Sequence, residues 1–94
     1  MFLEKFLKEI GITQVGHYTK SNSYVIDIEN SDEYGKIYSS LDKCDKLEED
    51  EDSSNVTIHT SNIVFESDDF QFILIADLDQ DTYKLVCKEI KGDK

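Results

Sequence analysis

The apolar positions of residues 2–10 repeat at helical spacing. They are Phe2, Leu3, Phe6, Leu7 and Ile10. This i, i+3, i+4 pattern predicts an amphipathic helix with one buried face. Gly11 follows directly and is expected to end the helix, because glycine readily adopts the left-handed conformation that often follows a helix C-terminus.

A second helix is predicted over residues 31–43. Its apolar face comprises Tyr34, Ile37, Tyr38 and Leu41. Asn30 or Ser31 can act as the N-cap, and Glu33 lies three residues after Asn30, as a capping-box partner should. Asp32 and Glu33 then occupy the positive end of the helix dipole, which is a structural reason for acids at these positions.

Other stretches alternate apolar and polar residues, which is typical of β-strands. Residues 23–29 predict a strand with one apolar face and one acidic face. Residues 55–67 also alternate, but the phase changes, so a bulge or tight turn is expected near 60–62. Residues 70–78 are apolar on both faces and predict the central strand, covered by helices on one side. Residues 82–90 predict the last strand.

These elements predict a single acidic α+β domain over residues 1–94. We expect an antiparallel sheet of four to five strands with two helices, in the order α-β-α-β-β-β. Residues 44–54 contain five consecutive acids, Glu48 to Asp52, and have no apolar periodicity. This segment predicts an acidic loop within the domain.

The formal net charge of −11, from 21 acids and 10 bases, limits the classes of partner. Such a charge repels nucleic acids and anionic membrane surfaces, so neither is expected as a partner. It favours a partner with a basic surface, such as a DNA-binding protein, although charge that only maintains solubility is the simpler alternative. The N-terminus does not resemble an export signal, so we expect a cytoplasmic protein (host cell cytoplasm if phage-encoded) with Cys44 and Cys87 as reduced thiols.

The sequence contains no recognisable catalytic or metal-binding motif. Three alternating acids imitate the start of a calcium loop: Asp77, Asp79 and Asp81. However, Thr82 occupies the position that requires glycine, and Lys88 the position that requires a bidentate glutamate, so a polar turn is expected. His17 and His59 have no second ligand at metal-binding spacing. We therefore expect a protein that is not an enzyme and that uses no cofactor.

The distribution of acids is the remaining functional feature. Residues i and i+2 on one face of a strand lie roughly 6–7 Å apart, which is close to the spacing of phosphates along a nucleic-acid strand. Asp27 and Glu29 meet this condition in the predicted strand. The acids of 48–52 lie in the predicted acidic loop, where they are expected to contribute mainly a long-range field.

Several segments are similar to the phage uracil-DNA glycosylase inhibitors, a family of small acidic proteins that mimic DNA. "YVIDIEN" (24–30) resembles the family's first, enzyme-engaging strand, and "SDEYGKIYSSL" (31–41) its second helix. "VTIHTS" (56–61) resembles the next strand, and "FILIADLDQDTYKLV" (72–86) the closing hairpin. The resemblance covers most of residues 20–90 as an order of elements, with few identities.

The resemblance implies a set of partner-binding positions. Glu29 and Asn30 are the nearest match to a Glu-Ser pair that contacts the enzyme, and Asp32 and Glu33 match acids that open the second helix. An apolar pocket that receives a leucine of the enzyme would be lined by Tyr34, Ile37, Tyr38, and Val56 or Ile58. Two departures stand out: one extra residue shifts the Glu-Ser register, and the segment 60–70 is too short for the family's full extra strand.

Together these features predict an acidic DNA-mimic inhibitor that occludes the DNA-binding surface of a host enzyme, with uracil-DNA glycosylase as the expected partner. The expected partner-binding residues are Asp27, Glu29, Asn30, Asp32, Glu33, Tyr34, Ile37, Tyr38, Val56 and Ile58. Alternatives are an anti-CRISPR protein or other phage anti-defence inhibitor of a nucleic-acid-binding protein, an immunity protein against a nuclease toxin, or an interaction domain without mimicry.

Overall fold

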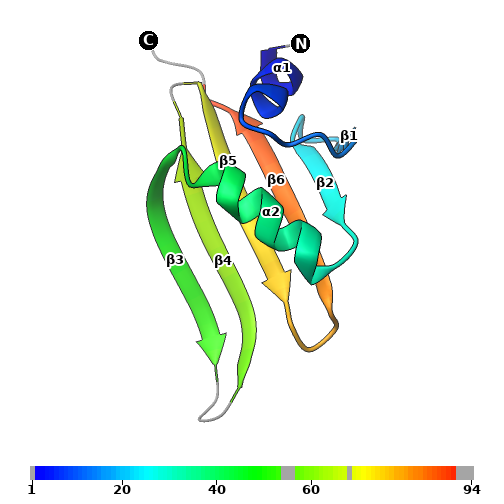
Figure 1. Ribbon diagram of the computed structural model, residues 1–94, viewed down its shortest axis with the longest axis vertical. Coiled ribbons are helices and arrows are strands. Elements are labelled where there is room, and N and C mark those ends of the chain that lie inside the picture. The colour runs from blue at the N-terminus through cyan, green and yellow to red at the C-terminus, as the bar shows by residue number, and fades with distance from the viewer. Residues whose placement is uncertain (1, 54–56, 68, 91–94) are drawn as a thin grey trace.

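The computed structural model describes residues 2–53, 57–67 and 69–90 of the 94-residue chain. Within these ranges the chain forms two helices and six strands around one core (Figure 1). In chain order the elements are α1 (Phe2–Glu9), β1 (His17–Tyr18), β2 (Tyr24–Ile28), α2 (Ser31–Leu41), β3 (Asp45–Ser53), β4 (Ile58–Glu66), β5 (Phe70–Asp77) and β6 (Thr82–Glu89). Neither of these helices is long and apolar enough to cross a membrane.

The strands join one antiparallel sheet in the order β1-β2-β6-β5-β4-β3. The predicted α+β class is therefore confirmed. The predicted four to five strands are too few, and the predicted order α-β-α-β-β-β lacks both β1 and β3. β1 has only two residues and no periodicity to reveal it. It is held beside β2 by pairing with Val25 and Tyr24, and the neighbouring Gly16 N–H donates to the Tyr24 hydroxyl at 2.8 Å.

The end of α1 shows why glycine occupies position 11. Gly11 has a φ of +99°, and its N–H donates to the Lys8 carbonyl, while the Ile12 N–H donates to the Leu7 carbonyl at 2.8 Å. This pair of bonds is the Schellman arrangement, which satisfies carbonyls left free at a helix end. Leu7 and Ile12 are both buried, so the motif also directs the chain back into the core.

Helix α2 begins as the sequence predicts. Asn30 is the N-cap, and its side-chain oxygen accepts a hydrogen bond from the Glu33 N–H at 2.9 Å. Asp32 and Glu33 lie in the first turn, where the helix dipole favours negative charge. The helix ends at Leu41, two residues before the predicted boundary, and Cys44 N–H then donates to the Leu41 carbonyl.

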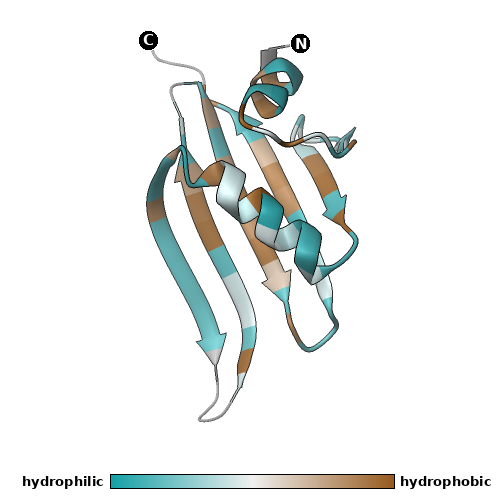
Figure 2. Cartoon of the chain, in the orientation of Figure 1, coloured by the Kyte–Doolittle hydropathy of each residue, from teal (hydrophilic) through white to brown (hydrophobic). Residues whose placement is uncertain are grey.

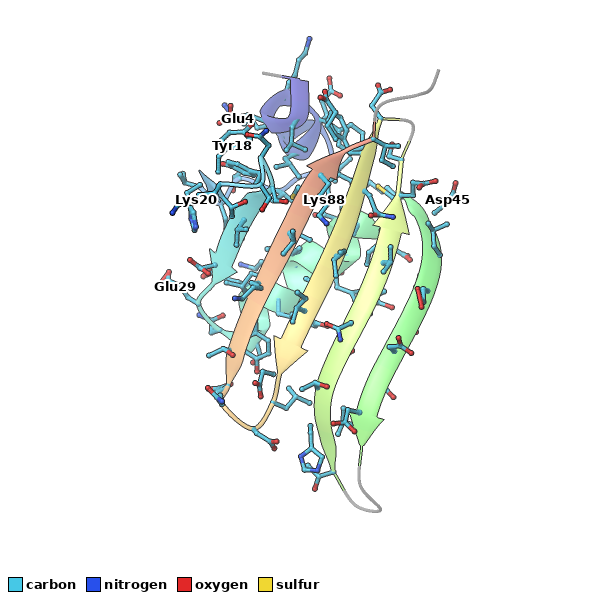
Figure 3. All side chains as sticks on the ribbon, turned by 180° about the vertical axis from the view of Figure 1, so that it is seen from behind. Glu4, Tyr18, Lys20, Glu29, Asp45 and Lys88 are labelled. Atoms are coloured by element: carbon cyan, nitrogen blue, oxygen red, sulfur yellow. The ribbon has the colours of Figure 1, made fainter. Side chains whose placement is uncertain are left out.

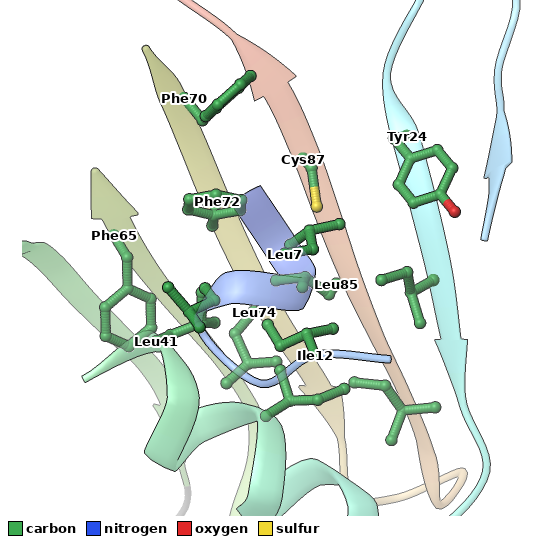
Figure 4. Close-up of a cluster of buried hydrophobic side chains, with 14 of the residues drawn as sticks. Leu7, Ile12, Tyr24, Leu41, Phe65, Phe70, Phe72, Leu74, Leu85 and Cys87 are labelled. Carbon is green, nitrogen blue, oxygen red and sulfur yellow. The ribbon is translucent and has the colours of Figure 1, made fainter. Parts of the chain in front are cut away.

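Both helices pack on the same face of the sheet, and the core lies between (Figures 1 and 4). Alternate residues of β5 point into it, and Phe72 and Leu74 are fully buried. Ile37 and Leu41 of α2 cover this layer from above. The predicted central position of β5, with helices on one side, is confirmed: β5 lies between β4 and β6. Figure 2 shows the resulting apolar bands beneath α2.

The acidic segment is a strand rather than a loop. β3 spans Asp45–Ser53 and pairs with β4, so the loop predicted for 44–54 is wrong over most of its length. An acidic segment can form a strand because the hydrogen bonds between strands join backbone groups and require no apolar side chains. β3 lies at the edge of the sheet, where its charged side chains stay hydrated and oppose edge-to-edge pairing with another copy. Figure 2 shows this strand as almost entirely hydrophilic.

The register between β3 and β4 contains two irregularities. Leu47 is an extra residue in β3, between the pairs Lys46↔Phe65 and Glu48↔Val64. Near the other end, the pairs Asp52↔Thr60 and Ser53↔Ile58 leave His59 as an extra residue in β4. This second irregularity explains the change of phase in the sequence pattern, and it lies just before the predicted position at 60–62.

Candidate functional site

The two acids predicted to form a rigid pair on the first strand do not do so. Asp27 is exposed in β2, and its cross-strand neighbour on β6 is Lys84. Directly opposed strand residues lie on the same face, so a positive charge stands beside this carboxylate. Glu29 is exposed but lies one residue beyond the end of β2 at Ile28. The i, i+2 strand geometry expected for Asp27 and Glu29 is therefore absent.

The predicted residues at the start of α2 have local structural partners. Asn30 caps the helix, and its side-chain oxygen already accepts the Glu33 N–H. A Glu33 carboxylate oxygen lies 3.5 Å from Gln14 Nε2, within hydrogen-bonding distance. Asp32 is exposed in the first turn. Of these three residues, Asp32 has its side chain fully available to a partner.

The predicted apolar pocket between α2 and the sheet is filled by the protein itself. Ile37 is only 1% exposed and belongs to the core. Tyr34 and Tyr38 are half-buried; the Tyr34 ring packs on Tyr83 at a centroid distance of 5.3 Å, and the Tyr38 ring meets Phe65 edge-on at 5.9 Å. Burial raises the pKa of the Tyr34 phenol, and its neighbours Glu49 and Glu51 raise it further.

Of the remaining pocket residues, Ile58 lies at the start of β4. Ile58 is 38% exposed, and Val56 lies outside the described residues. The predicted site as a whole is divided by the sheet. The α2 residues lie on the helix side, whereas Asp27 points to the opposite face together with Val25 and Lys84. A partner that binds one face of the sheet therefore cannot contact both Asp27 and the tyrosines of α2.

The structure instead places a second set of acids in strand geometry. Directly opposed residues share a face, and the odd-numbered residues Ser61, Ile63 and Phe65 of β4 are buried on the helix side. The acids of β3 that oppose the other, even-numbered positions of β4 therefore face away from the helices. They are Asp45, Glu48, Asp50 and Asp52. We call these four residues the acidic edge.

The acidic edge has the geometry that the sequence predicts for Asp27 and Glu29. Glu48, Asp50 and Asp52 follow one another at i, i+2 spacing, so their carboxylates repeat at roughly 7 Å along a paired strand. The sequence of β3, DKLEEDEDS, contains a single base. This base, Lys46, forms an ion pair with Glu49 at 3.1 Å on the helix side, and the hydrogen bond raises the lysine's pKa.

A sequence signal for this strand did exist. The residues Ser-Ser-Asn at 53–55 are typical of a turn, and the alternating segment after them predicts a strand. An antiparallel hairpin through that turn would pair the acids with β4. Hydrophobic periodicity alone misses this arrangement because β3 is exposed on both faces.

Other chemistry is limited within the described residues. The three alternating acids of the β5–β6 turn each have a different partner: Asp77 accepts the Gln80 N–H, Asp79 bonds to His59 at 2.9 Å, and Asp81 accepts the Tyr83 hydroxyl. No group of three or more described His, Cys, Asp or Glu side chains is arranged to hold a metal ion. A cavity of about 600 Å³ lies at the opposite end of the sheet, lined among others by Leu3, Tyr18, Phe70 and Lys88.

The chain matches no family model, and comparison with curated proteins and with solved structures finds no significant similarity. Assignment of a function therefore depends on the residues and geometry of this chain.

Proposed function

We propose that this protein is an acidic DNA mimic that inhibits a DNA-binding enzyme by covering its DNA-binding surface. The observation that supports this proposal is the acidic edge, because a paired strand holds its carboxylates in a regular series. A mobile acidic loop would attract any basic protein, whereas a series at fixed spacing can match a series of phosphate-binding groups. The net charge of −11 adds a field that steers a basic partner toward the protein.

The mechanism is competitive occlusion. Lys, Arg and backbone N–H groups that an enzyme uses for DNA phosphates would instead bind Glu48, Asp50 and Asp52. Charge-assisted hydrogen bonds to carboxylates are short and roughly twice as strong as neutral ones, so these contacts set the register of the complex. Salt weakens the encounter, because exposed charges are screened within about 8–10 Å at 0.1–0.15 M ionic strength.

Uracil-DNA glycosylase is the proposed enzyme, because the order of elements over most of residues 20–90 resembles that of inhibitors of that enzyme. The closed seam between α2 and the sheet departs from the leucine pocket that the resemblance implies. We therefore propose that the acidic edge, rather than that seam, contacts the DNA-binding surface of the enzyme.

A uracil-excision assay tests this function. The protein is added in near-stoichiometric amounts at low salt, and release of uracil from DNA is measured. We expect inhibition by the wild type and loss of inhibition in the triple variant Glu48→Gln, Asp50→Asn, Asp52→Asn. The matched control removes three charges elsewhere: Glu4→Gln, Glu9→Gln and Asp42→Asn, all exposed.

The control separates a specific surface from net charge. If both triple variants inhibit equally, the acidic edge has no special role. If the wild type does not inhibit the glycosylase at all, that enzyme is not the partner. The same design with a CRISPR effector nuclease and with a toxin nuclease then tests two of the alternatives, an anti-CRISPR protein and an immunity protein.

A further inference from the structure

The sheet face opposite the helices carries a row of half-buried apolar side chains. The row crosses four strands in direct register and consists of Val25 in β2, Val86 in β6, Ile73 in β5 and Val64 in β4. Adjacent strands are about 4.8 Å apart, so this row extends about 14 Å across the sheet. Figure 3 views this face, which no described helix covers. We call it the open face and its four residues the apolar row.

The apolar row runs directly into the acidic edge. Glu48 is the cross-strand neighbour of Val64, so the row ends in a carboxylate. Asp50 follows beside Asn62, next to Ile75, another half-buried apolar residue of this face. Apolar and acidic groups therefore form one continuous surface across the open face.

The strand residues of the open face carry mainly negative charge. Among strand residues on this face, the acids are Asp27, Asp45, Glu48, Asp50, Asp52, Glu66 and Asp77, and the lysines are Lys84 and Lys88. The carboxylates outnumber the lysines, and four of them lie together on β3. A partner that covers this face must therefore be basic where it meets β3.

The helix side places its β3 acids beside buried cross-strand neighbours. Its acids on β3 are Glu49 and Glu51, whose neighbours Ile63 and Ser61 are 3% and 8% exposed. The apolar side chains there already pack under α2. On the open face, by contrast, the exposed Glu48 has a half-buried apolar cross-strand neighbour, Val64, and a partner can contact both.

We propose that the open face is the docking surface, and that its occupant is a DNA-binding protein whose apolar side chains cover the apolar row while its basic side chains meet the acidic edge. This inference rests on the proposed function, because that function supplies a basic partner. Charge complementarity selects this occupant over a second copy of the chain: two open faces brought together would oppose carboxylates with carboxylates. Well-packed, fully desolvated groups near the centre of an interface dominate its affinity, whereas charged groups at its rim mainly set encounter rate and register.

The first test maps the surface without requiring the enzyme. A short peptide of alternating lysine and leucine is titrated into the 15N-labelled protein, and amide chemical-shift changes are recorded. A peptide of alternating lysine and serine is the control. We expect the lysine–leucine peptide to shift amides around Ile73, Val86 and Val64, and the control to shift amides of β3 only. Shifts centred on Tyr34 and Tyr38, or the same shifts for both peptides, would overturn the inference.

The second test uses uracil-DNA glycosylase and the double variant Ile73→Thr, Val86→Thr. Threonine is β-branched and suits a strand, so this variant removes apolar surface with little change of backbone preference. Its fold is checked by circular dichroism and thermal unfolding, and Val86→Thr alone serves if the double variant does not fold. The control is Val15→Thr, an 87% exposed valine outside the sheet.

We expect the double variant to raise the Kd for the enzyme at least tenfold with an unchanged salt dependence, and the control to stay within twofold of the wild type. A folded double variant that binds like the wild type refutes the docking surface and leaves the inhibitory function intact. Localised peptide binding on the open face without inhibition of the glycosylase supports the surface and refutes that enzyme as partner. Absence of both effects refutes both proposals.

Discussion

Replacing Asp50 by threonine should stabilise this protein, because Asp50 lies in a strand. The structure places Asp50 in the middle of β3, opposite Asn62 of β4, with its side chain exposed. Aspartate is depleted in strands and threonine is enriched, since a β-branched side chain suits the pleated surface. In an acidic loop the same change would bring no such gain.

The magnitude follows from the position of the residue. Strand preferences measured in host proteins span about 1 kcal/mol between the best and worst residues, and aspartate and threonine lie near its two ends. Because β3 is an edge strand with one paired neighbour, we expect a gain of about 0.5–1 kcal/mol in the free energy of unfolding. For a domain of this size, that corresponds to a rise of roughly 2–8 °C in Tm. Relief of repulsion from Glu48 and Asp52 adds to the gain at low salt.

The assay is urea unfolding at pH 7, at low and at high salt. The control is Asp32→Thr, which removes the same charge from another exposed aspartate. Asp32 lies in the first turn of α2, where its loss should lower stability by about 0.3–1 kcal/mol, because the helix dipole favours an acid there. The two variants should therefore shift stability in opposite directions.

Two results would refute this reasoning. If Asp50→Thr is no more stable than the wild type at low salt, the acidic segment does not behave as a paired strand. If both variants gain the same stability, the effect comes from net charge and not from local structure.

Three further predictions concern single groups. Leu41→Ala should cost about 3 kcal/mol because a cavity forms in the core, while Leu47→Ala, at a 53% exposed position, should cost less than about 0.5 kcal/mol in the same unfolding assay. Burial raises the pKa of the Cys87 thiol to about 12, so Ellman's reagent at pH 8 should label it only after unfolding; rapid labelling of the native protein, located by peptide mapping, would contradict that burial. The hydrogen bond and negative charge of Asp79 raise the pKa of His59 above 6.5, so NMR titration should show the His59 pKa falling in Asp79→Asn. The stability that this pair contributes is fully present below pH 6.5 and is lost as the pH rises through the raised pKa. If the difference in unfolding free energy between wild type and Asp79→Asn did not change with pH, this linkage would be disproved.

Much of the fold follows from hydrophobic spacing. The helices at 2–10 and 31–43 are predicted within two residues of their observed ends, because each buries one face and the spacing of apolar residues records it. The cap at Asn30 and the helix end at Gly11 also follow from residue type, since each has a local geometric requirement. The buried strands can also be predicted from their apolar residues: β5, at the centre of the sheet, is apolar on both faces.

The candidate site is less predictable. Asp27 and Glu29 have the i, i+2 spacing in the sequence, but β2 ends at Ile28, and Lys84 lies opposite Asp27. The local sequence reveals neither the end of β2 nor this pairing, because the pairing depends on the register with β6, almost 60 residues further along the chain. Ile37 fits the pattern of a pocket residue, yet the packing of α2 buries it completely in the core.

The sequence by itself determined the α+β class, the two helices, the central strand and the strongly negative charge. These are properties of single residues and of short-range periodicity, which burial imposes on each element separately. Only the tertiary structure decided that the acids of 45–52 form a strand, and which of them share a face with the apolar row. β3 buries no described side chain, so it has no apolar period, and it exists because β4 offers an open backbone edge. The acidic edge is therefore a consequence of long-range pairing.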